Sequence, residues 1–234
     1  MTPHSPTESA VAMVICRDAA ATLPATLASV LAERPGAIIV AWTPVGAADA
    51  TPAIVQRLAP EAELLRVETP GIAAARNAAV AAALARGKPL MAWCDADDRW
   101  LPGKLAAQVK VLAATEGAQW SVTALAKPDG TFPGFTPSTC LLRTEFVEAV
   151  GPWDTRFHLA ADHDWMVRAR RLAAPAELDA VLVEKGIHAG NASHDRLAYR
   201  RELMRWARLQ STPNANPDAN PDANPDANPD ANPD

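Results

Sequence analysis

Short, continuous apolar runs alternate with helix-like segments through the first half of the chain, and this alternation restricts the possible folds more than any other feature. An uninterrupted apolar run is typical of a strand that is covered on both faces. Such runs predict strands at residues 11–16, 37–42, 63–67 and 89–94, with helices at residues 22–33, 52–58, 71–86 and 102–115. A repeated strand–helix pattern predicts an α/β fold with a mostly parallel, twisted, Rossmann-like sheet flanked by helices.

The second half of the chain is less regular. Its pattern predicts strands at residues 119–126, 140–142 and 178–184, and helices at residues 144–150, 163–172 and 194–210. We therefore expect residues 11–211 to form a single domain, preceded by a disordered N-terminus at residues 1–10.

The last twenty residues are five copies of Ala-Asn-Pro-Asp, at residues 215–234. A proline in every fourth position prevents helix formation and most strand pairing. We expect residues 212–234 to be a disordered tail. Five of the 27 acidic residues lie in it, which leaves 22 acids against 22 Lys plus Arg in the rest of the chain. A body without basic excess argues against nucleic-acid binding.

The three cysteines are Cys16, Cys94 and Cys140, and their spacing suits neither a metal site nor a disulfide framework. Buried thiols in a reducing compartment are the simpler expectation. The start of the chain has no secretion signal, and no apolar run approaches the roughly 20 residues of a membrane span. These features predict a cytoplasmic protein without a membrane-spanning segment.

An acidic turn, Asp95-Ala96-Asp97-Asp98, follows directly after one of the predicted strands. Asp95 and Asp97 are two residues apart in extended chain, so both side chains can point to the same side. Ligands of parallel sheets bind at the carboxyl ends of the strands, and converging carboxylates suit a hard divalent cation. Asp98 can hold a ligand water or contact a bound donor. The alternative is an Asp-rich loop that caps the helix near Pro102.

The turn and its surroundings resemble a known family. The stretch GIAAARNAAVAAALARGKPLMAWCDADDRWLPGKLAAQVKVL is similar to the core of family 2 glycosyltransferases of the GT-A fold, and VAMVICRDAAATLPATLASVLAE to their first strand and helix. TPSTCLLRTEFVEAVGPWDTRF and AADHDWMVRARR resemble the acceptor-side segment. This resemblance implies a nucleotide-binding half at residues 11–115, an acceptor half at residues 116–211, and inverting sugar transfer from a nucleotide diphosphate.

The same resemblance implies roles for single residues. Asp95 would contact the ribose or the metal, and Asp97 would ligate Mn²⁺ or Mg²⁺. Arg76 would lie near the nucleotide, the alternatives being a helix-surface arginine or an ion pair with the acidic turn. Asn77 is expected to be structural. Of the tryptophans beside the turn, Trp93 is expected in the core and Trp100 in the wall of the sugar pocket.

The resemblance also implies a general base. Asp162 matches the family's catalytic carboxylate, although Ala161 stands where an acid usually precedes it. Asp164 is the alternative base, with the plainer role of an acid at a helix N-terminus. His188 resembles a histidine that reaches the metal or the phosphates in some members. Its alternative is a structural histidine.

One segment departs from the family pattern. Trp42 and Thr43 stand where the family has the acids that recognise the donor base, and Asp49 matches only a later acid. Base recognition would then depend on stacking on Trp42, on backbone groups, or on Asp18. Cys16, at the end of the first strand, completes the candidate donor contacts. We expect a UDP-sugar as donor.

The acceptor is open: a glycan, a lipid-linked glycan, a small molecule or a peptide. The arginine-rich helix at residues 194–210 is expected to pack its apolar side on the body, the alternative being a peripheral membrane or partner contact. Two other function classes remain. A nucleotidyltransferase would need a Gly-rich loop after the first strand, which is absent, and a non-catalytic binding protein is favoured by the altered segment after residue 41.

Overall fold

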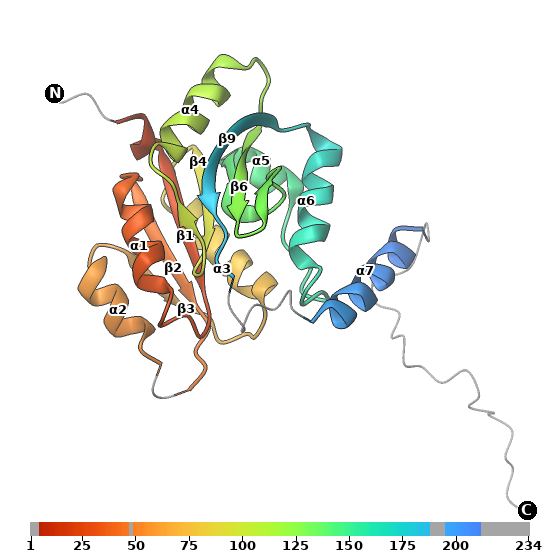
Figure 1. The fold of residues 1–234 in the computed structure, drawn as a ribbon, viewed down its shortest axis with the longest axis horizontal. Helices are drawn as coiled ribbons and strands as arrows, with labels where there is room; N and C mark the ends of the chain where they lie inside the picture. Colours follow the sequence, from red (N-terminus) through yellow and green to blue (C-terminus); the bar gives the residue numbers. More distant parts are fainter. Residues whose placement is uncertain (1–4, 47–48, 188–194, 212–234) are drawn as a thin grey trace, which may run out of the picture.

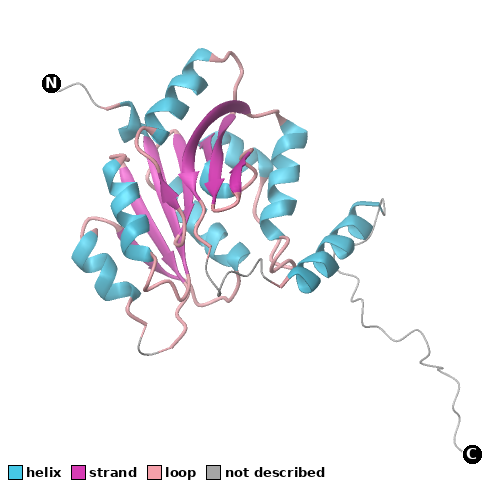
Figure 2. Cartoon of the chain, viewed as in Figure 1, coloured by secondary structure: helices cyan, strands magenta, loops and turns pink. Residues whose placement is uncertain are grey.

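A nine-stranded sheet with helices on both faces forms the centre of the molecule (Figures 1 and 2). The computed structural model describes residues 5–46, 49–187 and 195–211. The strands are β1 (Ala10–Cys16), β2 (Ala37–Trp42), β3 (Glu63–Arg66), β4 (Leu90–Asp95), β5 (Arg99–Trp100), β6 (Trp120–Lys127), β7 (Gly130–Phe132), β8 (Cys140–Arg143) and β9 (Ala176–Glu184). The α/β class with a sheet flanked by helices, expected from the sequence, is confirmed.

The helices connect these strands in the predicted order. They are α1 (Leu23–Ala32), α2 (Thr51–Leu58), α3 (Ile72–Leu84), α4 (Lys104–Ala114), α5 (Thr144–Val150), α6 (Ala161–Leu172) and α7 (Arg196–Ser211), with short 3-10 helices η1 (Pro6–Ser9) and η2 (Pro137–Thr139). Gly87 follows α3 with a φ of 61°, a conformation that glycine adopts without steric cost.

The strands lie in the order β3-β2-β1-β4-β8-β6-β9-β5, and β7 pairs with β6. The first four are parallel, so their carboxyl ends meet at one edge. At that edge Asp95 is in register with Ile15, Cys16 with Trp42, and Trp42 with Arg66. The acidic turn therefore begins where β4 leaves this edge, which is where parallel sheets bind ligands.

Each face of the sheet has its own hydrophobic core. Alternate β1 residues serve the two faces: Val11, Met13 and Ile15 pack with α3, α5 and α6, whereas Ala12 and Val14 pack with α1, α2 and α4. Burial on both faces explains why the strands are continuous apolar runs in the sequence.

Two features differ from the sequence expectation. Residues 1–10 were expected to lack structure, but Pro6–Ser9 forms η1 and Ala10 opens β1. The side chain of Thr7 is buried and donates a hydrogen bond to the Arg34 carbonyl, which holds this segment on the body. The short strands β5 and β7 were not predicted either, because two or three residues carry no periodicity. The expected disorder of the tail at residues 212–234 lies outside the described residues.

Helix α7 packs against the body beside the N-terminal end of α6. Its Glu202 carboxylate accepts hydrogen bonds from the backbone N–H groups of His158, Leu159 and Ala160. Trp206 donates its indole N–H to Asp164 at 2.9 Å. Packing of the apolar side of this helix on the body, as expected from the sequence, is thus observed. Across the described residues, none of the helices is both long and apolar enough to cross a bilayer.

Candidate functional site

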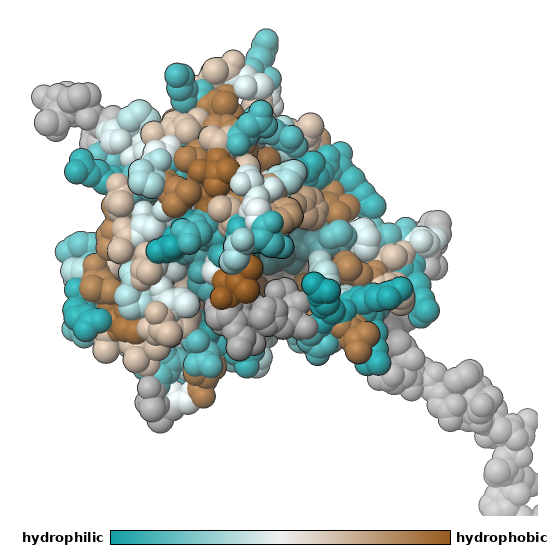
Figure 3. All heavy atoms as spheres, in the orientation of Figure 1, coloured by the Kyte–Doolittle hydropathy of each residue, from teal (hydrophilic) through white to brown (hydrophobic). Residues whose placement is uncertain are grey.

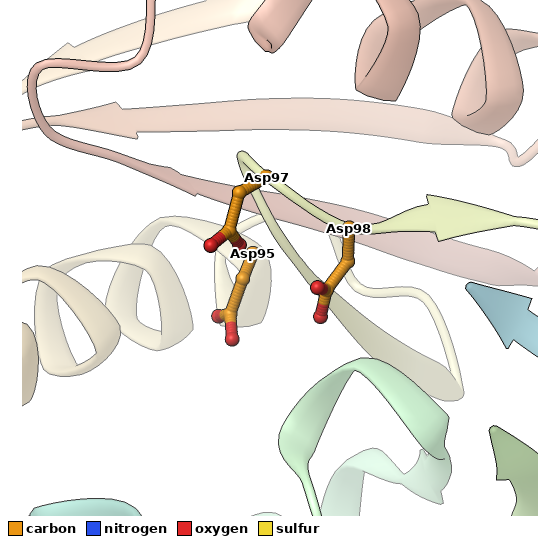
Figure 4. A group of neighbouring side chains, drawn as sticks. All are labelled: Asp95, Asp97 and Asp98. Atoms are coloured by element: carbon orange, nitrogen blue, oxygen red, sulfur yellow. The ribbon is translucent and has the colours of Figure 1, made fainter. Parts of the chain in front are cut away.

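Three carboxylates converge at the carboxyl edge of the sheet. One oxygen of each of Asp95, Asp97 and Asp98 lies within 4.8 Å of the others. Figure 4 shows the three side chains leaving the turn on the same side, as the spacing of Asp95 and Asp97 predicts. The close approach of like charges is costly unless cations or polar hydrogens compensate for it.

The backbone of the turn is fixed by neighbours from distant parts of the chain. The Thr26 hydroxyl of α1 lies 2.9 Å from the carbonyl oxygen of Ala96 and 2.8 Å from that of Asp98. The backbone N–H of Asp95 donates to the Ser138 hydroxyl of η2 at 3.0 Å. These contacts hold the three carboxylates in place without using their own oxygens.

Arg76 links the turn to the second half of the domain. Its guanidinium, which is fully buried, donates to Asp95 Oδ1 at 2.8 Å and to both oxygens of Asp162, at 2.5 Å from Nε and 2.8 Å from NH2. We expected Arg76 near the nucleotide. The structure shows the alternative, an ion pair with the acidic turn.

Asp162 stands at the start of α6 with 30% of its side chain exposed. Besides Arg76, the Trp153 indole N–H donates to its Oδ1 at 3.0 Å. The Asn77 side-chain amide donates through Nδ2 to the Trp153 carbonyl and accepts at Oδ1 from the Trp153 backbone N–H. This confirms the structural role expected for Asn77. The Trp153 ring stacks on Trp165 at 4.2 Å between centroids, so a rigid aromatic cluster supports the Asp162 carboxylate.

A lysine that the sequence did not single out lies among the three carboxylates. Lys185 Nζ is 3.4 Å from Asp95 Oδ2, 3.7 Å from Asp97 Oδ1 and 3.0 Å from Asp98 Oδ1. Its position follows from the pairing of β5 with β9, a long-range contact that no local pattern reveals.

The electrostatics of the turn differ from residue to residue. Burial alone would raise the pKa of Asp95, but Arg76 and Lys185 hold it down at about 2. Burial raises the pKa of Asp98 to about 6, because this side chain has no exposed surface. Burial opposes the charge on Lys185, yet the neighbouring Asp95 and Asp98 raise its pKa above the usual range. Asp95 is therefore ionised at neutral pH.

Convergent carboxylates with a cation already among them fit a divalent metal. Their oxygens are hard donors of the kind that Mn²⁺ and Mg²⁺ prefer, and an ammonium group stands where positive charge is favoured. Asp95 and Asp97, with 20% and 18% of their side chains exposed, can reach such an ion.

A pocket of about 530 Å³ opens beside the carboxyl end of β2. It is lined by Trp42, Pro44, Gly46, Asp49, Pro52 and Arg66. The Trp42 indole N–H donates to Asp49 Oδ2 at 2.8 Å, and the Arg66 guanidinium lies 5.4 Å from the centroid of the Trp42 ring. Two strand spacings, about 10 Å, separate Trp42 from Asp95 along the sheet edge.

Several expected donor contacts are placed elsewhere. Trp100 is 3% exposed, and the Lys104 ammonium lies 4.4 Å from the centroid of its ring, so we assign it to the core rather than to the sugar pocket. Cys16 is also buried, with its Sγ 3.6 Å from the Thr51 hydroxyl, and has no surface for a donor. The Asp98 side chain contacts Lys185 and the Gly186 N–H instead of solvent.

The remaining candidate site residues lie in different environments. Asp18 is exposed just after β1, at the expected edge. Asp164 is buried and binds Arg168 and Trp206, which removes it as the alternative base. Trp93 lies in the core, as expected. His188 lies outside the described residues.

Comparisons with known proteins agree with this fold. Residues 11–170 match the family model described as glycosyl transferase family 2. No curated protein matches the chain. Among solved structures, TarS from S. aureus has a TM-score of 0.67 and 15% identity over 86% of this chain and 39% of that chain. This chain thus spans well under half the length of TarS.

Two further structures contain ligands. TarS residues 1–349 in complex with UDP-GlcNAc gives a TM-score of 0.69 and 15% identity, covering 86% of this chain and 66% of that chain. Glucosyl-3-phosphoglycerate synthase from Mycobacterium tuberculosis, in complex with Mn²⁺, UDP and phosphoglyceric acid, gives 0.65 and 13%, covering 88% and 80%. At these identities the likeness shows the fold.

Proposed function

Because the chain belongs to glycosyltransferase family 2, we propose that it transfers a sugar from a nucleoside diphosphate donor to an acceptor hydroxyl with inversion, assisted by a divalent metal. The observation that carries the proposal is the joining of Asp95 and Asp162 by one buried guanidinium. Asp95, the proposed donor-binding carboxylate, and Asp162, the candidate base, are 67 positions apart in the sequence. Both contact Arg76 and so lie in one rigid site.

In the proposed mechanism, Asp95 and Asp97 would hold the metal ion beside the donor. Mn²⁺ or Mg²⁺, when bound, would neutralise charge that develops on the leaving phosphates. Asp162 takes the proton of the acceptor hydroxyl as this oxygen attacks the anomeric carbon from the face opposite the diphosphate. The bond from the anomeric carbon to the leaving oxygen breaks as the new bond forms, so the configuration inverts.

The pocket beside β2 supports a site for the donor base. It lies about 10 Å from Asp95, the order of the distance between a base and the diphosphate of one nucleotide. Trp42 is 7% exposed with Arg66 over its ring, and the Arg66 side chain is largely exposed and pairs with an exposed Glu68. We propose that a base enters between Trp42 and Arg66. A uridine nucleotide is favoured by the UDP complexes of the structural neighbours.

We propose that the acceptor is a glycan, a lipid-linked glycan, a small molecule or a peptide. Helix α7 supports peripheral contact with an anionic membrane, because its arginines Arg196, Arg200, Arg201, Arg205 and Arg208 are all exposed. Leu197 and Met204 of the same helix are 70% and 48% exposed, and Figure 3 shows brown spheres among the teal ones over this helix. Sedimentation with anionic and neutral vesicles tests this contact: binding to both or to neither would contradict it.

Asp162→Asn is the test of the catalytic assignment. The variant keeps the shape of the side chain and can still accept from Trp153, but it cannot take a proton. We expect donor binding measured by calorimetry to be unchanged, and the rate of nucleotide release during sugar transfer to fall at least about 100-fold. Asp154→Asn is the matched control, since the Asp154 carboxylate pairs with the half-exposed side chain of Arg156 and does not contact Arg76.

Normal turnover of Asp162→Asn would refute this residue as the base. Donor binding by the parent protein without any turnover would instead favour a non-catalytic binding protein. The altered segment after β2, which lacks the family's base-recognising acids, is the observation that favours this second reading.

A further inference from the structure

The pairing of β5 with β9 places Lys185 beside the acidic turn. In the antiparallel pair of β5 and β9, Arg99 faces Glu184 and Trp100 faces Val183. One step further along the same register, Lys185 faces Asp98. The backbone N–H of Lys185 also donates to the Ala126 carbonyl of β6 at 2.9 Å, so the residue is held from both sides. Its place is therefore set by the sheet and not by a mobile loop.

The next residue allows this approach because it is glycine. The Gly186 N–H donates to Asp98 Oδ1 at 3.1 Å, and a Cβ at this position would collide with the carbonyl oxygen of Asp97. The two segments thus touch backbone to backbone. The Lys185-Gly186 segment therefore brings one ammonium group in among three carboxylates.

The charge of the cluster leaves room for a divalent ion. Four carboxylates, those of Asp95, Asp97, Asp98 and Asp162, contact two cations, Arg76 and Lys185. With all groups ionised the net charge is −2, so the cluster still attracts a further cation. Arg76 is fully buried and approaches from the side of α3, whereas Lys185 lies among the carboxylate oxygens themselves.

A metal ion and the Lys185 ammonium group cannot both occupy this position. Mg²⁺ bound by Asp95 and Asp97 lies about 2.1 Å from their oxygens. Nζ of Lys185 lies 3.4 Å from Asp95 Oδ2 and 3.7 Å from Asp97 Oδ1, so an ion bound to the same Asp95 oxygen would be at most about 5.5 Å from the ammonium group. Like charges at that distance repel strongly. The lysine stem is flexible and its side chain is 21% exposed, so the ammonium group can leave.

We propose that Lys185 is a built-in counter-cation of the acidic turn, which occupies the metal position when no metal is bound and must move away for the metal to bind. The proposal rests on the proposed metal-assisted function. The lysine keeps the three carboxylates together in the empty enzyme, and it lowers the affinity of the turn for free metal. Metal then binds best when a nucleotide diphosphate arrives with it, because the displaced ammonium group gains a new anionic partner.

The experiment measures Mn²⁺ binding without nucleotide, by calorimetry and by the loss of the free Mn²⁺ signal in electron paramagnetic resonance. Lys185→Met and Lys185→Gln remove the competing charge, and we expect both to bind Mn²⁺ at least about tenfold more tightly than the parent. Lys110→Met, which removes an exposed lysine of α4, is the control for net charge and should bind as the parent does. In a chelator, both Lys185 variants should unfold at a lower temperature than the parent, and Mn²⁺ should restore the loss.

Each other outcome contradicts the proposal in a distinguishable way. Equal or weaker Mn²⁺ binding by both Lys185 variants, with clear binding by the parent, overturns the competition and leaves the metal-assisted function standing. Absence of Mn²⁺ binding from all four proteins, with and without UDP, overturns both. The glutamine variant keeps a polar end group and guards against a failure of the methionine variant to fold.

Discussion

At the scale of single residues, each carboxylate of the acidic turn has a different task because each has different partners. Asp95 is shared by Arg76 and Lys185, and Asp97 is 18% exposed with Lys185 3.7 Å away. Asp98 is fully buried against Lys185 and Gly186, just after β9. Asp98 thus fastens the second half of the domain to the turn. The two other carboxylates are left for the proposed metal.

Gly186→Ala tests the close contact between the two segments. The new Cβ would meet the Asp97 carbonyl, so the segment after β9 must shift away from the turn. We expect a loss of about 1–3 kcal/mol in the free energy of unfolding and weaker Mn²⁺ binding. Urea denaturation and calorimetry measure the two effects. Gly103→Ala, which adds a Cβ in open space at a φ of 85°, is the control for backbone strain alone. If its loss of metal binding equals that of Gly186→Ala, the contact is not the cause.

At the scale of elements, the local sequence pattern predicted most helices and strands, whereas contacts that depend on long-range strand pairing could not be predicted. The buried strand β4 followed by acids could be predicted, because an apolar run and its abrupt end are both written in neighbouring residues. Trp100 was misplaced because its side depends on the pleat of β5, in which Arg99 is exposed and Trp100 is buried. Lys185 was missed because its importance arises only from pairing with a segment 87 positions away from it, at Asp98.

Glu202 joins helix α7 to the segment that leads into α6, and this contact predicts a pH dependence. Burial opposes ionisation of this carboxylate, but the three backbone N–H groups that it accepts from lower its pKa below the usual 4.5. A lowered pKa means that the stabilisation is fully present above pH 4.5 and is lost as the pH falls through the lowered value.

Glu202→Gln should therefore cost about 1 kcal/mol of unfolding free energy at neutral pH, the usual value of a helix cap. The difference from the parent should shrink below pH 4.5. Urea denaturation at several pH values measures it, with Glu148→Gln, an exposed residue of α5, as control. A constant difference across the pH range would mean that the charge of Glu202 is not responsible.

At the scale of the whole molecule, one sheet with a core on each face joins the two halves. The arginine of α3 binds an aspartate at the end of β4 and another at the start of α6, so the site spans the same boundary as the cores. The class of fold could be predicted, since it depends on alternation along the chain. The arrangement around Arg76 could be named only as an alternative, because a helical arginine looks the same in sequence whether it faces solvent or a carboxylate.

Truncation tests which parts belong to the folded unit. Removal of residues after Ser211 should shift the unfolding temperature by less than about 2 °C and leave one cooperative transition. Removal of all residues from Arg196 onward should lower it clearly, because the partners of Glu202 and Trp206 are then left bare. Calorimetric scanning measures both. A large loss on removing only the repeats would show that the tail belongs to the folded body.

The proposed function requires the acidic turn to bind a metal together with a sugar nucleotide. The most direct measurement is thermal stabilisation of the parent and of Asp97→Ala by UDP-, GDP- and dTDP-sugars, each with Mn²⁺ and with a chelator. We predict stabilisation by one nucleotide class, dependent on Mn²⁺ and absent from the variant. No stabilisation by any donor, or equal stabilisation of the variant, would contradict metal-dependent donor binding at the acidic turn.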